Sequence, residues 1–385
     1  MMKLRLQNFA LLLQNSAEKG LLLLVACIIA IVSINTELTS SIYQGLVASE
    51  ISFVFFHISL TEFTNEFLMA IFFLLVGLEI KREMVDGNLS KPKQRILPVA
   101  AAIGGVVVPV LIYLVFNLYD STKVRGWAVP AATDIAFSLG VLALLGKGLP
   151  VSLRVFLTAL AIIDDLIAVI IIALFYSSGL DTYYLTMILV ITFFIFCLNL
   201  IKFNKISLYM LMGFALWYAF YKSGIHPAVS GVVLGLSIPY KVGDSDKSLL
   251  KVFERNLSGV VQYFILPLFA FVNSGVMFSF STAIFMDSIV LGTIAGLFIG
   301  KQLGIFATSY FLIKKKIAVL PTGAGWAQFY GVAILCGIGF TMSLFVGDLA
   351  FVGPEYVNEM KLGVLTGSLI SAVVGLLFLK LVAKK

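Results

Sequence analysis

The chain has 385 residues, of which 60% are hydrophobic and only 12% are charged. Soluble domains are about 45–50% apolar and about 25% charged, so this composition excludes a water-soluble enzyme, a nucleic-acid-binding protein and a disordered chain. The formal net charge is +7, and the placement of the basic residues decides what that charge means. Cys27, Cys197 and Cys336 lie far apart in apolar stretches, a pattern that disfavours a disulfide framework and a zinc or iron–sulfur site.

The apolar residues form blocks as long as the roughly 20 residues that cross a bilayer. By this measure the sequence predicts an all-α polytopic membrane protein, a single domain over 1–385 with about twelve spanning helices. The predicted spans are 11–34, 59–80, 96–117, 126–146, 150–175, 183–201, 206–221, 223–240, 257–275, 289–312, 327–350 and 360–382. The seventh and eighth are short for a span. No loop is long enough to be a catalytic domain.

The lysines and arginines gather at alternate ends of these spans. If the N-terminus is cytoplasmic, Lys123, Arg125, Lys222 and Lys361 lie at outside ends, Lys301 lies mid-span, and the other 22 of the 27 lie at inside ends. This bias predicts an even number of spans with both termini in the cytoplasm. The net charge therefore reflects topology in a lipid bilayer and requires neither nucleic acid nor an acidic partner.

Four ionisable side chains lie near the middle of predicted spans, where a charge costs about 2.5–3.5 kcal/mol on insertion scales. They are Asp134, Asp164, Asp165 and Lys301. Because adjacent helix positions point about 100° apart, Asp164 and Asp165 are not expected to face the same partner. Charges at this depth are usually functional, and a purely structural salt bridge of the aspartates to Lys301 is the alternative. For Lys301 two roles stay open, a structural counter-ion to one aspartate or a proton carrier.

Two of the spans are interrupted. In the first, Pro130 lacks a backbone donor, and Thr133 and Asp134 are suitable N-cap residues for the helix that follows. In the second, Gly337 and Gly339 lie at the centre. Irregular backbone at membrane depth occurs only where it is buried in protein or lines a cavity. An ordinary proline kink is the alternative for the first span.

The interrupted spans also resemble each other, since TDIAFSL (133–139) and GFTMSLF (339–345) share a Ser-Leu pair after small and bulky residues. As the fourth and eleventh spans they run in opposite directions. Paired broken helices in two units of opposite orientation are the inverted-repeat plan of secondary transporters. We expect repeats over 95–176 and 289–382, with Asp134 offsetting the positive half-helix ends and Lys301 the negative ends.

Five segments together resemble the NhaA family of sodium/proton antiporters, one of the transporter families from which the inverted-repeat plan is known. They are FFLLVGLEIKRE (72–83), GWAVPAATDIAFSLGVLALLG (126–146), ALAIIDDLIAVIIIALFY (159–176), ILPLFAFVNSGV (265–276) and ILCGIGFTMSLF (334–345). The likeness runs in order from about residue 60 to the C-terminus. It implies an electrogenic, pH-dependent antiporter of the bacterial inner membrane that exports Na⁺ and Li⁺ in exchange for H⁺, without a cofactor, for sodium and pH homeostasis.

The resemblance also implies roles for residues. Asp164 and Asp165 would be the cation- and proton-binding pair that ligates Na⁺, with Asp134, Thr133 and Lys301 at the crossing of the broken helices. A cytoplasmic pH-responsive cluster is implied at Glu79, Arg82, Glu83, Lys251 and Glu254. The sequence departs from the family there, because Arg255 and Ser258 stand where histidines are expected. His226 matches a family motif and is either part of the pH response or a helix-end cap before Pro227.

Other classes of protein fit less well. An intramembrane aspartyl protease needs two carboxylates beside Gly-rich or Tyr-Asp signatures, which TDIAF and IIDD lack. Paired broken helices with a mid-membrane lysine suit a carrier better than an open cation channel. An antiporter for a different monovalent cation stays open, whereas the acidic midplane disfavours an organic anion. No GxxxxGK[ST] motif is present, so coupling to an ion gradient is expected instead of ATP hydrolysis.

The stretch SEISFVFFHISL (49–60) alternates in the manner of a strand pair. It belongs to a segment, 35–58, that we expect to be a loop on the outer face. The family resemblance implies a homodimer formed through such a hairpin.

Overall fold

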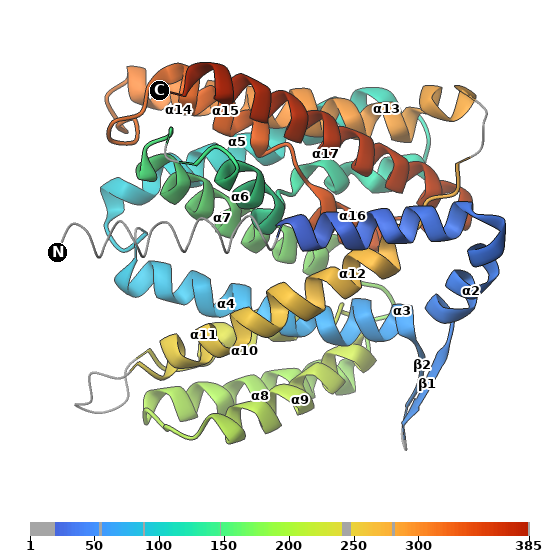
Figure 1. Cartoon of the computed structure of the whole chain (residues 1–385). Helices are drawn as coiled ribbons and strands as arrows, with labels where there is room; N and C mark the ends of the chain where they lie inside the picture. Colours follow the sequence, from blue (N-terminus) through green and yellow to red (C-terminus); the bar gives the residue numbers. More distant parts are fainter. Residues whose placement is uncertain are drawn as a thin grey trace. The chain divides into compact units, whose positions relative to one another are not determined.

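The computed structural model describes residues 20–53, 56–87, 89–146, 148–240, 248–278 and 282–383. Nearly all of this part of the chain is helical, as the ribbons of Figure 1 show. The all-α prediction is confirmed. Contacts divide the chain into two compact units, each assembled from separate segments. Unit 1 is Met1–Glu37, Lys91–Asp165 and Ser274–Lys385, and unit 2 is Leu38–Ser90 and Leu166–Asn273.

Unit 1 contains both interrupted spans. Its elements are the helix Gly20–Asn35, α5 (Pro92–Asn117), the 3₁₀ helix η2 (Lys123–Ala131), α6 (Ile135–Ala143), the first part of α7 (Val151–Phe175), the 3₁₀ helix η4 (Thr282–Met286), α13 (Ser288–Ala295), the π-helix η5 (Gly296–Gly300), α14 (Lys301–Lys314), α15 (Trp326–Leu335), α16 (Phe340–Ala350) and α17 (Pro354–Val382). Helix α17, drawn in dark red in Figure 1, packs against α13 and α15.

Helices α5 and α14 approach closely enough to exclude side chains between their backbones. A Cβ atom on Gly104 would lie 2.5 Å from the Gly304 carbonyl oxygen, and one on Gly304 would lie 2.1 Å from the Gly104 carbonyl oxygen. Such close approach of small residues is a common way for helices to associate in membranes, where apolar surfaces gain nothing from leaving lipid. It positions α14, and Lys301 at its start, against α5.

Unit 2 holds the remaining elements. They are α2 (Glu37–Val47), β1 (Glu50–Phe53), β2 (Phe56–Ser59), α3 (Leu60–Glu62), the π-helix η1 (Phe63–Leu68), α4 (Met69–Asp86), the end of α7, α8 (Thr182–Leu200), α9 (Ile206–Ser223), α10 (Ala228–Ser237), α11 (Leu249–Val260), the π-helix η3 (Val261–Ile265) and α12 (Leu266–Asn273). Helices α4 and α10 pack against each other, and α8 pairs with α9 at the lower edge of Figure 1.

The segment 35–58 differs from the expected loop because α2 occupies much of it. The Tyr43 side chain is buried there, and its hydroxyl donates hydrogen bonds to the carbonyl oxygens of Phe271 and Val272 at 2.8 and 3.2 Å. This tertiary anchor accounts for an ordered helix in a short polar sequence. Strands β1 and β2 follow as an antiparallel pair in which Glu50 faces Ser59 and Phe53 faces Phe56.

A helix corresponds to each predicted span, but the count of twelve is not confirmed. Among the described residues seven helices are long and apolar enough to cross a membrane, or ten if each bent pair forms one span. Helix α10 has only ten residues, about 15 Å of rise against a hydrocarbon core of about 30 Å. The start of the first predicted span (11–19) and basic residues counted at inside ends (Lys3, Arg5, Lys19, Lys147, Lys241, Lys247, Lys384 and Lys385) lie outside the described residues.

Candidate functional site

The two broken helices have closely similar geometry. η2 and α6 are bent by 43° at their break, and α15 and α16 by 42°. η2 ends one residue after Pro130, whereas Gly337 and Gly339 fall between α15 and α16, so the predicted interruptions are confirmed. A Cβ atom on Gly337 would lie 2.5 Å from the Leu297 carbonyl oxygen, which explains why this position carries no side chain.

A single carboxylate caps the two half-helices that leave these breaks. Asp134 is the N-cap of α6, and its Oδ1 accepts the N–H of Phe137 at 2.9 Å. Its Oδ2 accepts the N–H of Thr341 at 3.1 Å and the Thr341 hydroxyl at 2.5 Å, in the first turn of α16. Asp134 is 2% exposed. Because helix N-termini carry unsatisfied donors and partial positive charge, this buried carboxylate stabilises both ends at once.

Lys301 and Asp164 form a fully buried ion pair beside the crossing. The distance from Lys301 Nζ to Asp164 Oδ2 is 2.6 Å, and both side chains are inaccessible to solvent. The Thr133 hydroxyl lies 2.8 Å from the same Oδ2 atom. The other carboxylate oxygen, Asp164 Oδ1, is buried and has no hydrogen-bond partner among the described residues. Asp164 thus holds one oxygen against Lys301 and Thr133, whereas the second has no hydrogen-bond partner in the described part of the chain.

Thr133 joins the aspartate to the second broken helix. Its hydroxyl oxygen lies 2.8 Å from the Cys336 carbonyl oxygen, at the end of α15, as well as from Asp164. A hydroxyl carries one proton and therefore donates fully to only one of these two oxygens at a time. Asp165 is also buried, at 3% exposed, but it is Asp164 that contacts Lys301 and Thr133. Adjacent helix positions point about 100° apart, so the two carboxylates leave α7 in different directions.

A π-turn precedes Lys301, a feature that the sequence did not reveal. The Lys301 N–H bonds the Gly296 carbonyl, five residues back, at the end of η5. A π-turn adds a residue to one helical turn and rotates the positions that follow, and such turns are frequent at functional sites. A Cβ atom on Gly296 would lie 2.6 Å from Pro130 Cβ, so η5 packs directly against the first broken helix.

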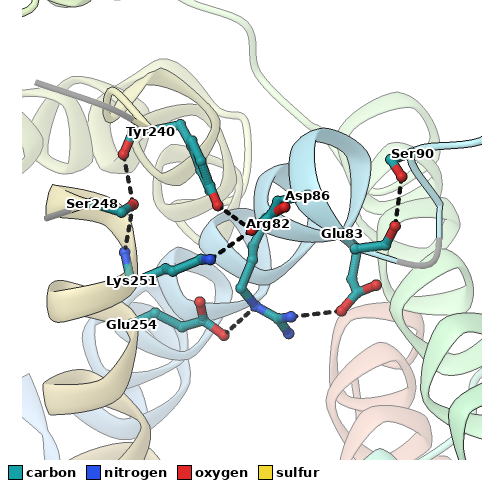
Figure 2. A network of polar contacts seen from close by, with 9 residues as sticks. Arg82, Glu83, Asp86, Ser90, Tyr240, Ser248, Lys251 and Glu254 are labelled. Carbon is teal, nitrogen blue, oxygen red and sulfur yellow. Dashed lines mark hydrogen bonds and ion pairs between the residues drawn. The ribbon is translucent and has the colours of Figure 1, made fainter. Parts of the chain in front are cut away.

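The residues expected in a pH-responsive cluster lie in unit 2, and Figure 2 shows most of them. Arg82 contacts Glu83 at 2.7 Å through Nη1 and Glu254 at 2.8 Å through Nε, which links α4 to α11. Glu79 also acts electrostatically on Arg82. The structure therefore brings together Arg82, Glu83 and Glu254, with Glu79 nearby.

Lys251 has a different partner. Its Nζ donates to Asp86 Oδ2 at 2.6 Å, and the Tyr240 hydroxyl donates to the same oxygen at 2.5 Å (Figure 2). Ser248 caps α11 by accepting the Lys251 N–H and donates its own hydroxyl proton to the Tyr240 carbonyl. Asp86 and Tyr240 were missed in the sequence. The available signal was weak, since Asp86 lies one helical turn after Arg82 on the same face of α4.

His226 is not part of this cluster. Its Nε2 lies 3.5 Å from Glu66 Oε2, and its Nδ1 accepts the Ala228 N–H at the start of α10 at 3.2 Å. Glu66 and Arg82 are sixteen residues apart along η1 and α4, a helical rise of about 24 Å. The contact with Ala228 is the helix-end cap that was one of the two expected roles.

Comparison with known proteins identifies the family of this chain. The family described as Na⁺/H⁺ antiporter 1 matches residues 10–379. The Na⁺/H⁺ antiporter NhaA of Pelagibacter ubique is 45% identical over 379 residues, covering 97% of each chain. That of Pseudomonas putida is 48% identical over 374 residues, covering 95% of each, and that of Caulobacter vibrioides is 45% identical, covering 97% of this chain and 91% of its own. The chain belongs to the NhaA family of Na⁺/H⁺ antiporters, which are secondary transporters and not enzymes.

Proposed function

We propose that this protein exchanges sodium for protons across a bacterial inner membrane, and that Asp164 is the centre of the exchange. The observation that carries the proposal is the unequal use of the two Asp164 oxygens. Oδ2 contacts Lys301 and Thr133, whereas Oδ1 is buried without a hydrogen-bond partner in the described structure. A hard monovalent cation prefers oxygen ligands, and a carboxylate with one unused oxygen supplies such a ligand. The names of the curated relatives, Na⁺/H⁺ antiporters, support sodium as the cation.

Sodium and protons compete for the same carboxylates. A proton on Asp164 or Asp165 removes the negative charge that a cation needs, so the site holds protons or a cation but not both. The two carboxylates titrate as a pair, and the protons are shared between them. Exchange follows if the site faces one side of the membrane when protonated and the other side when it binds the cation. Lithium, with the same charge and preference for oxygen, is a second cargo.

Net charge movement follows from the number of carboxylates. Asp164 and Asp165 accept two protons, and one sodium ion replaces them, so each cycle moves one net charge. Charge transfer across the membrane is worth about 2.3 kcal/mol per elementary charge per 100 mV. The membrane potential therefore drives sodium export, and in this scheme Lys301 is the counter-ion of Asp164. The physiological role is sodium and pH homeostasis.

The inverted-repeat plan assigns the two halves of this machinery to 95–176 and 289–382. The near-equal bends of the two broken helices, 43° and 42°, support this assignment. Asp134, Thr133, Pro130, Gly337 and Gly339 then form the crossing at the repeat interface, where such transporters bind their cargo.

Regulation and assembly involve unit 2. The ion pairs of Arg82 with Glu83 and Glu254, together with Glu79 and Lys251, form a polar cluster whose pH response is weak near neutrality, because Arg255 replaces a titratable histidine. The β1–β2 hairpin forms the contact of a homodimer. Both termini are cytoplasmic, as the distribution of basic residues requires.

Purified protein in proteoliposomes tests the exchange. Vesicles loaded with an acidic interior and a pH-sensitive dye should alkalinise when sodium or lithium is added outside, and respond much less to potassium or choline. A response to potassium alone would show that the cargo is a different cation, and no cation-dependent proton movement would contradict antiport.

A further inference from the structure

The Ser-Leu pair common to the two interrupted spans corresponds to a reciprocal pair of hydrogen bonds. On α6, the Ser138 hydroxyl donates to the Leu335 carbonyl oxygen at the end of α15, at 3.1 Å. On α16, the Ser343 hydroxyl donates to the Val129 carbonyl oxygen near the end of η2, at 2.7 Å. Each half-helix that leaves the crossing is thus bonded to the half-helix that enters it from the other span.

Both serine hydrogen bonds lie in the buried interior of the protein. Both serines are fully buried, at 0% exposure. Carbonyl groups near the C-terminal end of a helix lack a full set of intrahelical donors. In an apolar interior a hydroxyl-to-carbonyl bond is stronger than in water. The Leu335 carbonyl also accepts the Ile338 N–H at 3.1 Å, so the Ser138 bond is the second of two at that oxygen. The two bonds therefore fix how the broken helices cross.

The two carbonyls that accept the serine hydrogen bonds lie close to Thr133, one beside a residue that Thr133 contacts and the other on the segment that carries Thr133. Leu335 is followed by Cys336, whose carbonyl oxygen is 2.8 Å from the Thr133 hydroxyl. Val129 lies in the last turn of η2, four residues before Thr133. Ser138 thus holds the backbone that Thr133 contacts, and Ser343 holds the backbone that carries Thr133. Thr133 in turn lies 2.8 Å from Asp164 Oδ2.

We propose that Ser138 and Ser343 are positioning residues which, by fixing the crossing of the broken helices, hold Thr133 against Asp164 and set the affinity of the site for sodium. Their own hydrogen bonds go to backbone carbonyls, so they act through Thr133. The inference rests on the proposed sodium/proton exchange at Asp164. It assigns a role to the matched serines of the two interrupted spans.

The test measures initial exchange rate against sodium concentration in proteoliposomes. Ser138→Ala and Ser343→Ala should each raise the apparent KM for sodium about 2- to 10-fold, the effect of one hydrogen bond, at a nearly unchanged maximal rate. Ser138→Thr keeps the hydroxyl and should return KM toward the wild-type value. If Ser138→Ala does not accumulate in the membrane, Ser138→Cys preserves the volume with a weak donor and should show the same rise.

Ser309→Ala is the matched control. Ser309 is fully buried on α14 of the same unit, but its hydroxyl has no hydrogen-bond partner among the described residues. Its removal should leave KM unchanged. An unchanged KM in Ser138→Ala and Ser343→Ala, or an equal rise in Ser309→Ala, overturns the proposal. So does a fall in maximal rate at constant KM, which indicates a structural role only.

The double variant, Ser138→Ala with Ser343→Ala, tests whether both serines fix the same crossing of the broken helices. If they do, its KM should rise by less than the product of the two single effects, since the second loss acts on a crossing already loosened. A rise equal to that product means independent action and overturns the pairing. Failure of the proposed function is distinguishable, because it appears in the wild-type protein as absence of sodium-dependent proton movement. Normal wild-type exchange with unaltered serine variants contradicts this inference alone.

Discussion

Lys301 Nζ and Asp164 Oδ2 lie 2.6 Å apart in a site that solvent does not reach. A buried ion pair of this kind contributes little to stability as a whole, but removing one partner leaves the other charged and unpaired, at a cost of about 3–5 kcal/mol. The two residues are 137 positions apart in the sequence, and α14 and α7 carry them. The pair therefore links the two predicted repeats electrostatically.

The first prediction concerns the acid pair. Asp164→Asn and Asp165→Asn should each abolish sodium-driven proton movement in proteoliposomes, because each removes a charge and a titratable group while keeping the shape of the side chain. Protein yield and thermal unfolding report whether the variants fold. Rapid exchange by either variant would show that the substituted aspartate is not part of the binding site.

Asp120→Asn is the control for these variants. Backbone N–H groups of Lys123 and Thr122 donate to Asp120 Oδ1 and hold the pKa of this exposed carboxyl below its usual value. It therefore stays ionised at every pH of the assay, and an asparagine oxygen can accept the same bonds. Exchange should be unchanged, which shows that loss of a carboxylate as such is harmless.

The second prediction separates the two roles of Lys301. As a counter-ion only, Lys301→Gln should lower the melting temperature while exchange still moves net charge, because Asp164 and Asp165 remain to carry protons. A membrane-potential dye read alongside the pH dye measures this. Exchange that persists without an electrical signal would show instead that the lysine carries one of the protons.

The third prediction concerns Asp134, which caps two helices. Loss of one N-cap costs about 1 kcal/mol, so Asp134→Ala should destabilise the protein by about 2 kcal/mol or more in thermal or denaturant unfolding. Asp181→Ala is the comparison, since Asp181 is exposed and caps only α8 through the Tyr183 N–H. Equal losses for the two variants would mean that the bond from Asp134 to Thr341 adds nothing to stability.

The fourth prediction concerns topology. A single cysteine at Ala383, in a background where Cys27, Cys197 and Cys336 are replaced, should resist a membrane-impermeant thiol reagent in intact cells. It should react after permeabilisation, since the basic residues indicate a cytoplasmic C-terminus. Labelling in intact cells would show that the C-terminus lies outside the cytoplasm and would contradict the prediction.

The fifth prediction concerns pH. Competition between protons and sodium for Asp164 and Asp165 predicts that apparent sodium affinity weakens as pH falls and that saturating sodium largely restores the rate at pH 7. Arg255, in place of a titratable histidine, leaves the cytoplasmic cluster little to titrate near neutrality. Initial rates over a range of sodium concentrations at several pH values measure this. A maximal rate that still falls at neutral pH would indicate a separate sensor.

The features that sequence predicted correctly are those that depend on local chemistry. Pro130 lacks a backbone donor and disfavours a continuous helix, and Asp134 has a short acceptor side chain suited to an N-cap. The break at Gly337 was also visible in the sequence, because glycine is unfavourable in a helix interior. The features that sequence did not reveal depend on long-range packing. The bond from Asp134 to Thr341 spans 207 positions, and the π-turn before Lys301 accompanies the contact of Gly296 with Pro130. Asp86 was overlooked because an exposed charge near a helix end usually has no tertiary partner.

The shared cap at Asp134 has a mechanical consequence. Since one carboxylate accepts N–H groups from both α6 and α16, any motion that parts these half-helices strips a buried helix end of its acceptor. Opening at the centre of the crossing is therefore expected to be a costly way to change which side of the membrane the site faces. We expect the change of access to carry both half-helices together, as a rigid body whose internal hydrogen bonds are kept.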